Sequence, residues 1–420
     1  MSKIPEDLSQ LVPFNPERKK WKRFSSISQH IGLIFAISAC AILGFSLVAL
    51  RFFQQPARIA GPSETPTATA RPTLTVTPTS TMIANLTPLL PTPEPVNIAT
   101  PTATAKSEVI GFYVNWDENS LASLKKNINS LDKLIPEWLH LANSNGAIVA
   151  DDLTIQQKTL KFIKNTLPTL PIMALVNNYN NEIQDWDSVR LAKMLASPSA
   201  RATNIQALLD FVQTNKLQGI SIDYESVPAE SSPALTAYMS ELYARFHPLG
   251  LEVSQSVAVD DPGFDYHSLT KYADYLILMV YDEHWSTSED GPVASRQMFA
   301  DALKLHLSQV DTSKYVIGIG NYGYDWIDGT RQGADISFED ATRIAQKYKA
   351  KVVIDPVSLN PTFDYTDGAG KLHHVWFLDA STALNQVAEA QRYLVRGFAL
   401  WRMGSEDPAI WKVFGQQANP

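Results

Sequence analysis

Two hydrophobic patterns alternate along the chain between residue 107 and its C-terminal end. Short apolar runs rich in β-branched and aromatic residues predict strands, and longer stretches with apolar residues every three or four positions predict helices. The predicted strands are residues 109–116, 138–144, 171–178, 219–225, 251–259, 275–282, 315–324 and 397–403. Helical patterns lie between them, as at 153–167, 233–247 and 295–309. Eight strands that alternate with helices predict an α/β fold, a parallel sheet closed into a (β/α)8 TIM barrel.

The spacing between the seventh and eighth predicted strands departs from this alternation. Residues 325–396 separate them, and this stretch contains further strand-like runs. Within it, "TDGAGK" (366–371) is typical of a hairpin turn. We therefore expect a small α+β insertion between strands seven and eight.

The N-terminal part of the chain contains an uncharged apolar run, residues 31–50, about as long as a helix that crosses a bilayer. Basic residues gather before this run, at 17–24, and few follow it. That asymmetry predicts a signal anchor at 30–53, with a basic cytoplasmic tail at 1–29 and the rest of the chain outside the cytoplasm. A cleaved signal peptide is the alternative, but the run is long for one and "PARIAG" (56–61) is a poor cleavage site.

Residues 54–106 have a different composition, dominated by threonine, proline and alanine. Such a segment buries too little apolar surface to fold, and its prolines favour extended polyproline II conformations. We expect a disordered Pro/Thr-rich linker here, which would hold a folded domain at 107–420 away from the membrane.

Charge and motifs narrow the function classes. The net charge of −8 gives no support to nucleic-acid binding, which requires a basic surface. The chain has one cysteine, so an intrachain disulfide is excluded. H-E-x-x-H, P-loop and G-x-S-x-G motifs are absent, and "GIGNYG" (318–323) precedes loop residues instead of the helix that a nucleotide site needs. We therefore expect no metal and no cofactor.

Polar residues interrupt the strand predicted at 219–225, "GISIDYE". Because side chains repeat every two residues along a strand, Ser221, Asp223 and Glu225 share one face, which points into the barrel. Glu225 lies nearest the C-terminal end of the strand, where barrel enzymes have their active sites. Two carboxylates this close compete for ionisation, so one tends to hold a proton, as a general acid must. A hydrogen-bonded polar layer in the barrel interior is the alternative interpretation.

Four of these stretches together resemble glycoside hydrolase family 18, the chitinase-like family. The matching stretches are "VIGFYVNW" (109–116), "GISIDYE" (219–225), "LMVYD" (278–282) and "GFALW" (397–401). The resemblance covers about 110–415 and is greatest to spore-germination-type members and to modules fused to polysaccharide deacetylases and glycosyltransferases. It implies retaining hydrolysis of β-linked N-acetylglucosamine polymers, in which the substrate's own acetamido group acts as the nucleophile.

The resemblance also implies roles for individual residues. Glu225 would be the general acid and base, Asp223 would orient the acetamido group, and Tyr281 would bond its oxygen. Trp401 would be the floor under the −1 sugar, and Tyr113 a wall beside it. Further substrate-binding positions are Ser221, Met279, Asp282, Trp285, Asn321 and Tyr322. For Asn321 and Tyr322 ordinary barrel packing is the alternative, and for Trp285, with His284, loop anchoring is.

Two acids of the family signature, D-x-x-D-x-D-x-E, are replaced by Gln218 and Ser221. In the family the second acid shares a proton with the third. Ser221 can donate a hydrogen bond to Asp223 but cannot take up its charge. The replacement affects the expected efficiency and pH optimum and leaves the general acid in place.

The sequence thus predicts a membrane-anchored extracytoplasmic glycosidase whose partners are the membrane and an N-acetylhexosamine polymer. Chitin, peptidoglycan and poly-N-acetylglucosamine all carry the required acetamido group. A lectin-like barrel without catalysis is one alternative, and a scaffold partner in exopolysaccharide export is another. We expect the pair His373–His374 to lie in a solvated turn without a partner at metal-ligand spacing.

Overall fold

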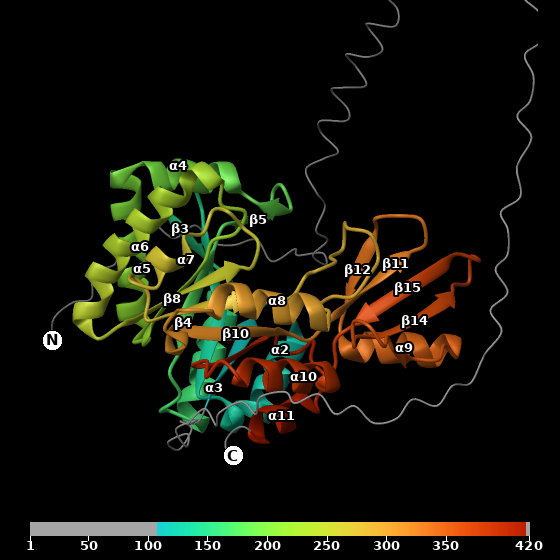
Figure 1. The fold of residues 1–420 in the computed structure, drawn as a ribbon. Coiled ribbons are helices and arrows are strands. Elements are labelled where there is room, and N and C mark those ends of the chain that lie inside the picture. Colours follow the sequence, from blue (N-terminus) through green and yellow to red (C-terminus); the bar gives the residue numbers. More distant parts are fainter. Residues whose placement is uncertain (1–106, 417–420) are drawn as a thin grey trace, which may run out of the picture. The chain divides into compact units, whose positions relative to one another are not determined.

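The computed structural model describes residues 107–416, which form a parallel β-barrel surrounded by helices, with a smaller sheet attached (Figure 1). The barrel strands are β1 (Glu108–Val114), β2 (Lys133–Leu141), β4 (Met173–Asn177), β7 (Gly219–Asp223), β8 (Glu252–Ala258), β9 (Tyr275–Met279), β10 (Tyr315–Gly320) and β16 (Gly397–Trp401). Neighbouring strands pair in parallel, and β1 pairs with both β16 and β2, which closes the sheet. The predicted eight-stranded barrel is confirmed.

Helices connect the strands and cover the outside of the barrel. They are α2 (Glu118–Asn127), α3 (Leu153–Thr166), α4 (Ser188–Ala196), α5 (Pro198–Asn215), α6 (Ser232–Phe246), α7 (Tyr266–Leu269), α8 (Arg296–Leu307), α10 (Ala380–Gln391) and α11 (Ile410–Gln416). Most of them begin after a residue whose side chain accepts a backbone N–H of the first turn, such as Asp117, Asp152 and Ser295. Such a cap stabilises a helix by about 1 kcal/mol.

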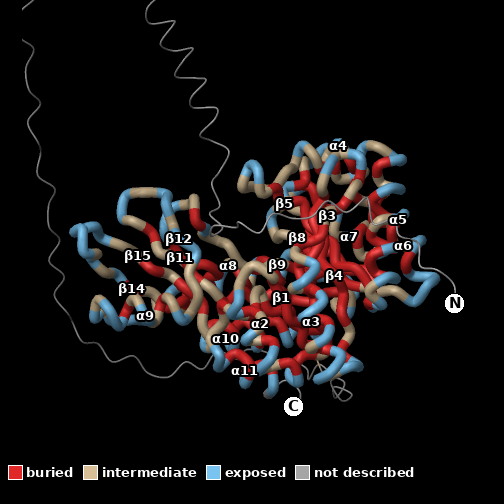
Figure 2. Tube along the Cα trace, turned by 180° about the vertical axis from the view of Figure 1, so that it is seen from behind, coloured by how far each residue is buried: buried red, intermediate tan, exposed pale blue. Residues whose placement is uncertain are grey.

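Side chains of the strands alternate between two cores. Inward-facing residues such as Ile110, Ile135 and Leu175 fill the barrel interior. The residues between them, such as Trp138 and Tyr224, pack against the surrounding helices in a larger outer core. Figure 2 shows the buried strands at the centre and exposed positions on the outer faces of the helices. Both faces of each strand are therefore buried, and an inward polar side chain must find a partner inside the barrel.

The second strand begins earlier than expected. The prediction was 138–144, whereas β2 is Lys133–Leu141. Lys133, Pro136 and Glu137 made the first part of this strand look unlike a buried strand, although each of its nine residues is buried. The strand predicted at 315–324 also ends early, because β10 stops at Gly320.

A cluster of charges occupies the N-terminal end of the barrel. Lys133 Nζ lies 2.9 Å from the carboxylate of Glu108 and 2.6 Å from that of Glu252, and Arg396 Nε lies 2.8 Å from Glu108. Lys133 also donates a hydrogen bond to the hydroxyl of Tyr275 at 3.3 Å. Burial opposes ionisation of Glu108, but Lys133 and Arg396 outweigh it and lower the pKa of that carboxyl. At the base of the barrel, the positive and negative side chains thus neutralise one another.

The insertion between β10 and β16 is a small α+β unit, as predicted. Its elements are β11 (Gly323–Ile327), β12 (Gly333–Ile336), α9 (Phe338–Tyr348), β13 (Val353–Ile354), β14 (Pro361–Thr366) and β15 (Leu372–Phe377). The strands form one antiparallel sheet, against which α9 packs through Ala341 and Ala345. The predicted hairpin turn joins β14 to β15: the carboxylate of Asp367 accepts the N–H groups of Ala369 and Lys371, and Gly370 has a φ of 81°.

The described part of the chain also contains the short strands β3 (Ile148–Ala150), β5 (Tyr179–Asn180) and β6 (Asp185–Trp186). Single-turn 3-10 helices lie at Ile128–Ser130, Ala229–Ser231, His247–Leu249 and Thr312–Lys314. Within residues 107–416, every helix is too short or too polar to cross a membrane. The predicted anchor at 30–53 and linker at 54–106 lie outside the described residues.

We expect the substitution Lys133→Met to lower the free energy of unfolding by about 3 kcal/mol, because it removes the buried cation that Glu108 and Glu252 share and leaves Arg396 as their remaining partner. The stabilisation that Glu108 provides is present at neutral pH and is lost as the pH falls through its lowered pKa, so the difference from wild type should shrink in acid. Urea unfolding at several pH values measures this. Lys125→Met on the exposed face of α2 is the control, and an equal effect of both substitutions would contradict the proposed charge cluster.

Candidate functional site

A cavity of about 610 Å³ opens at the C-terminal ends of the barrel strands. The predicted site residues that line it are Asp223, Glu225, Met279, Tyr281, Asp282, Trp285 and Trp401. They come from β7, β9 and β16 and from the loops that follow these strands, so separate parts of the sequence meet in one place. The barrel end at which they meet is the one predicted from the position of Glu225.

The two carboxylates of the β7 region reach this cavity because of strand alternation. Asp223 is the last residue of β7 and is 5% exposed, and Glu225 lies two residues further on and is half-buried. Tyr224, between them, points the other way into the outer core, where its hydroxyl donates to Asn204 Oδ1 at 3.1 Å. The buried Tyr224 side chain thus keeps its two neighbours directed into the cavity.

Asn178, which the sequence analysis did not single out, holds the backbone of Glu225. The Glu225 N–H donates to Asn178 Oδ1 at 2.8 Å, and Asn178 Nδ2 donates to the Glu225 carbonyl at 3.0 Å. Glu225 lies past the end of β7, so its backbone groups have left the strand ladder and need such a partner. Asn178 is fully buried, and its only signal in the sequence was its place at the end of a predicted strand.

Asp282 is held from the insertion by two tyrosines. The hydroxyls of Tyr322 and Tyr324 both donate to Asp282 Oδ1, at 2.6 Å and 2.7 Å. Burial, and then the charge of Asp282, raise the pKa of Tyr322 well above its ordinary value, so this donor keeps its proton. Tyr322 is therefore a support for Asp282 and is not among the residues that line the cavity, and its ring packs edge-on against Tyr281, with centroids 6.1 Å apart.

Trp401 and Phe112 form an aromatic wall of the cavity. Their rings meet edge to face, with centroids 5.3 Å apart. The expectation that Tyr113 forms this wall is corrected: its side chain lies in the outer core, with its hydroxyl 3.1 Å from Thr159 Oγ1. Neighbouring residues of a strand point to opposite faces, so an error of one position exchanged Tyr113 for Phe112.

Ser221 and Asn321 do not line the cavity. Ser221 is fully buried and accepts a hydrogen bond from Ser254 Oγ at 3.0 Å. Asn321 supports the loop after β16: its N–H donates to the Trp401 carbonyl at 2.9 Å, and its Oδ1 accepts the N–H of Asp407 at 2.6 Å. For Asn321 the alternative of structural packing fits these contacts.

The loop after β9 contributes a rim residue. Trp285 is 44% exposed, lines the cavity, and donates its ring N–H to Thr287 Oγ1 at 3.0 Å. His284 instead anchors the loop, with its Nδ1 2.9 Å from the carbonyl of Pro292. Carboxylates that the sequence analysis missed, Asp260, Asp261 and Glu283, also line the cavity.

His373 and His374 lie on β15, so their expected place in a turn was wrong. The turn is formed by the residues just before them, and both rings are bound to carboxylates. His373 Nδ1 lies 2.8 Å from Asp325, and His374 lies 2.8 Å from Asp364 and 3.2 Å from Asp328. Burial opposes the charged form of His374, but these two carboxylates raise its pKa. Across residues 107–416, His, Cys, Asp and Glu side chains form no group of three or more suited to hold a metal ion.

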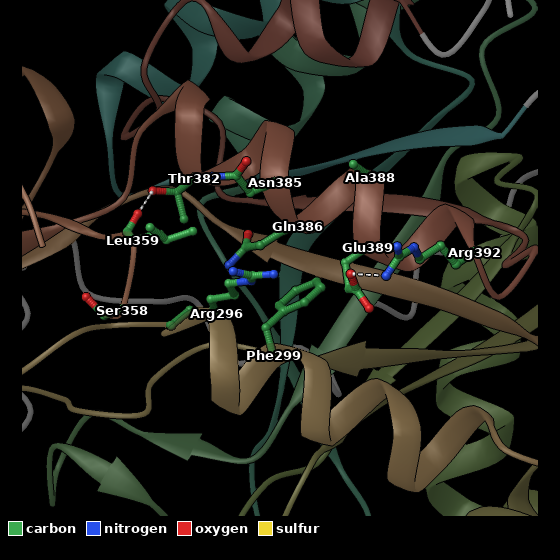
Figure 3. Close-up of a pocket in the computed structure, with 11 residues that line it drawn as sticks. Arg296, Phe299, Ser358, Leu359, Thr382, Asn385, Gln386, Ala388, Glu389 and Arg392 are labelled. Atoms are coloured by element: carbon green, nitrogen blue, oxygen red, sulfur yellow. Dashed lines mark hydrogen bonds and ion pairs between the residues drawn. The ribbon is translucent and has the colours of Figure 1, made fainter. Parts of the chain in front are cut away.

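A second cavity, of about 400 Å³, lies between α8 and α10 (Figure 3). None of the predicted site residues lines it. The Arg392 guanidinium pairs with Glu389 at 3.0 Å, and Thr382 Oγ1 is 3.5 Å from the Leu359 carbonyl. The carboxylates of β7 are absent from this cavity, so we place the candidate active site in the larger one.

Comparison with known proteins matches the family model "Glycosyl hydrolases family 18" to residues 108–406. An uncharacterized glycosylase of Bacillus subtilis is 26% identical over 71% of this chain and 88% of the relative. The cortical fragment-lytic enzyme of the same organism is 25% identical over 66% of each chain. Among solved structures, a chitinase of Chromobacterium violaceum has a TM-score of 0.69 and 24% identity, covering 75% of this chain and 99% of that one.

The two tyrosine donors to Asp282 give a prediction about stability. Tyr322→Phe and Tyr324→Phe should each lower the free energy of unfolding by about 1.5 kcal/mol, the usual contribution of a hydrogen bond to a charged group. The double variant should lose more free energy of unfolding than the two single variants together, because Asp282 then loses both hydroxyl donors. Chemical denaturation of the four proteins measures this. Strictly additive losses would show that the two hydroxyls do not act on a shared carboxylate.

Proposed function

We infer that this chain, which belongs to glycosyl hydrolase family 18, is a glycosidase acting on polysaccharides that contain N-acetylglucosamine. The observation that carries this inference is the meeting of Asp223, Glu225, Tyr281 and Trp401 in one cavity at the barrel mouth. The cavity joins a carboxyl at its surface, a more deeply buried carboxyl, a phenol and an aromatic wall. These are the groups that binding and cleaving an acetamido sugar require.

We propose a substrate-assisted retaining mechanism. Glu225 gives its proton to the glycosidic oxygen as the bond to the anomeric carbon breaks. The acetamido oxygen of the same sugar attacks that carbon and forms a cyclic oxazolinium ion, so a carboxylate nucleophile is unnecessary. Glu225, now ionised, takes a proton from water as the water opens the ring from the original face. The product keeps the β configuration, and the proton is returned to Glu225.

Asp223 and Tyr281 act on the acetamido group. Asp223 is buried, so its negative charge acts through a low dielectric on the positive charge that develops on the oxazolinium ring. Tyr281 lines the same cavity and would donate its hydroxyl proton to the acetamido oxygen. Trp401 offers a flat surface to the C–H face of the sugar, which leaves the sugar hydroxyls free to form hydrogen bonds.

We also propose that the domain is displayed outside the cytoplasm by an N-terminal anchor. The support comes from sequence: the apolar run at 31–50, the basic residues before it and the Pro/Thr-rich segment at 54–106. A polymer too large to enter the cell would then reach the cavity.

Glu225→Gln should lower kcat by roughly 10²–10⁴-fold, because it removes the proton donor while keeping the shape of the side chain. The purified protein is incubated with chitin oligomers, peptidoglycan and poly-N-acetylglucosamine, and the products are followed by mass spectrometry and anomeric NMR. Glu230→Gln, on the exposed part of the same loop, is the control and should keep the activity. If both wild type and Glu225→Gln bind the oligomers and neither cuts them, the lectin-like alternative holds.

Asn178→Ala should lower kcat by roughly 10²-fold, because a small displacement of the Glu225 backbone moves the acid away from the glycosidic oxygen. KM should stay within a few-fold of wild type, since the aromatic wall is unchanged. Asn215→Ala, which removes an asparagine bond at the end of α5, is the matched control. An unchanged kcat for Asn178→Ala would show that its two bonds to Glu225 do not position the acid.

A further inference from the structure

Glu137 is a buried acid for which neither the sequence analysis nor the proposed mechanism has a role. It lies on β2 and is 3% exposed. Ile135, two residues before it, belongs to the barrel interior, whereas Trp138, the next residue, belongs to the outer core. Strand alternation therefore directs the Glu137 carboxyl into the barrel. A carboxyl in such a place is costly unless it is paired or keeps a proton.

The strand register shows at what height Glu137 stands. Val114 at the top of β1 pairs with Glu137, and the ladder continues through Leu175, Ser221 and Ser254 to Tyr275. Tyr275 contacts Lys133 in the charge cluster at the base of the barrel. Hydrogen-bonded partners thus descend from mouth to base around the barrel, by about one residue per strand, as expected for eight tilted strands.

This descent places Glu137 level with Asp223. Glu137 is joined through Leu175 to Ser221, two strands away. Two strands correspond to a descent of about two residues, so the β7 residue at the height of Glu137 is the one two positions above Ser221, which is Asp223. Alternate strands contribute the side chains of one barrel layer, and β2 and β7 are the second and fourth strands.

The same descent, of about one residue per strand, places Met279 of β9 and Trp401 of β16 in the layer of Glu137 and Asp223. Asp223, Met279 and Trp401 line the cavity, and Glu137 is the layer member that does not. Lys133 lies on the same strand nearer the base of the barrel, where it is bound to Glu108 and Glu252. Glu137 is therefore a buried carboxyl in the layer of Asp223 that does not line the cavity.

For two buried carboxyls in one layer, ionisation of both carries a large cost. Ser221, directly before Asp223 on the inward face of β7, is neutral and accepts its hydrogen bond from Ser254. We propose that Glu137 is the positioning residue that shares a proton with Asp223, supplied from β2 because β7 carries serine at position 221. The inference rests on the proposed function: as positive charge develops on the oxazolinium ring, the proton moves from Asp223 to Glu137, and it returns when the ring opens.

Glu137→Gln and the double variant Glu137→Gln/Ser221→Asp test this with N-acetylglucosamine oligomers over a range of pH. The single variant should lower kcat by roughly 10²-fold with little change in KM, and it should shift the pH optimum, since Asp223 loses its proton partner. The double variant restores a carboxyl beside Asp223 and should recover at least ~10-fold of the lost kcat together with the original pH profile. A wild-type kcat and profile for Glu137→Gln would overturn the proposal, and so would a loss of activity that Ser221→Asp does not restore.

Glu108→Gln is the matched control, since Glu108 is also an inward glutamate of a neighbouring strand but belongs to the charge cluster at the base. It should lower the melting temperature and leave the pH profile of kcat unchanged. If Glu108→Gln shifts the profile as much as Glu137→Gln does, the effect is one of general stability and the proposal fails.

The pH dependence of unfolding tests the proton sharing independently of catalysis. A native state that holds a proton which the unfolded chain releases loses stability as the pH rises above the ordinary pKa of a carboxylic acid, about 4. Wild type should therefore lose more stability as the pH rises above this value than Glu137→Gln does. If no polymer is cut by the wild type but this difference is found, the proposed function fails and the proton sharing stands. Parallel stability curves for the two proteins would overturn the proton sharing.

Discussion

The parallel sheet closes because β1 pairs with both β2 and β16, and this closure determines where every inward side chain lies. A closed sheet has no free edge, and every strand has one face toward the interior. The height of each inward residue is then set by the register of the hydrogen bonds. Residues from the second, fourth, sixth and eighth strands meet in one layer although they are far apart in sequence. The cavity and its chemistry follow from that layer.

Charge is distributed along the barrel axis in two unlike groups. At the base, Lys133 and Arg396 neutralise Glu108 and Glu252, and the resulting ion pairs contribute to stability. At the mouth, carboxylates gather without a lysine or arginine among the residues that line the cavity. Neutralised charges at one end and acids at the other are the arrangement expected when one end of a barrel supports the fold and the other performs acid–base chemistry.

Much of the fold could be predicted from the sequence because the signals are local. The apolar runs located the eight strands, and the alternation in "GISIDYE" placed Asp223 and Glu225 on the inward face. Alternation alone does not say which of the two faces of a strand points inward. The prediction therefore put Tyr113 in the cavity wall, where the structure has Phe112. Glu137 was not predicted as a strand residue because Pro136 beside it and Lys133 before it are atypical of a buried strand.

Other parts of the site depend on contacts between segments that no local pattern records. The bonds from Asn178 to the backbone of Glu225, and from Tyr322 and Tyr324 to Asp282, each join residues about 40 or more positions apart. An asparagine after a strand, or a tyrosine in an insertion, can form hydrogen bonds with many different partners. Its partner is determined only when the barrel has closed and the insertion has packed beside it.

Two chitin oligomers that differ only in the acyl group of the −1 sugar, one acetyl and one trifluoroacetyl, test whether the substrate's own amide is the nucleophile. Fluorine withdraws electrons from the carbonyl oxygen that must attack the anomeric carbon. If the substrate's own amide is the nucleophile, the rate constant for cleavage should fall by orders of magnitude with the fluorinated oligomer while binding is kept. Equal rate constants for the two oligomers would contradict the account, because they would show that the amide takes no part in the step.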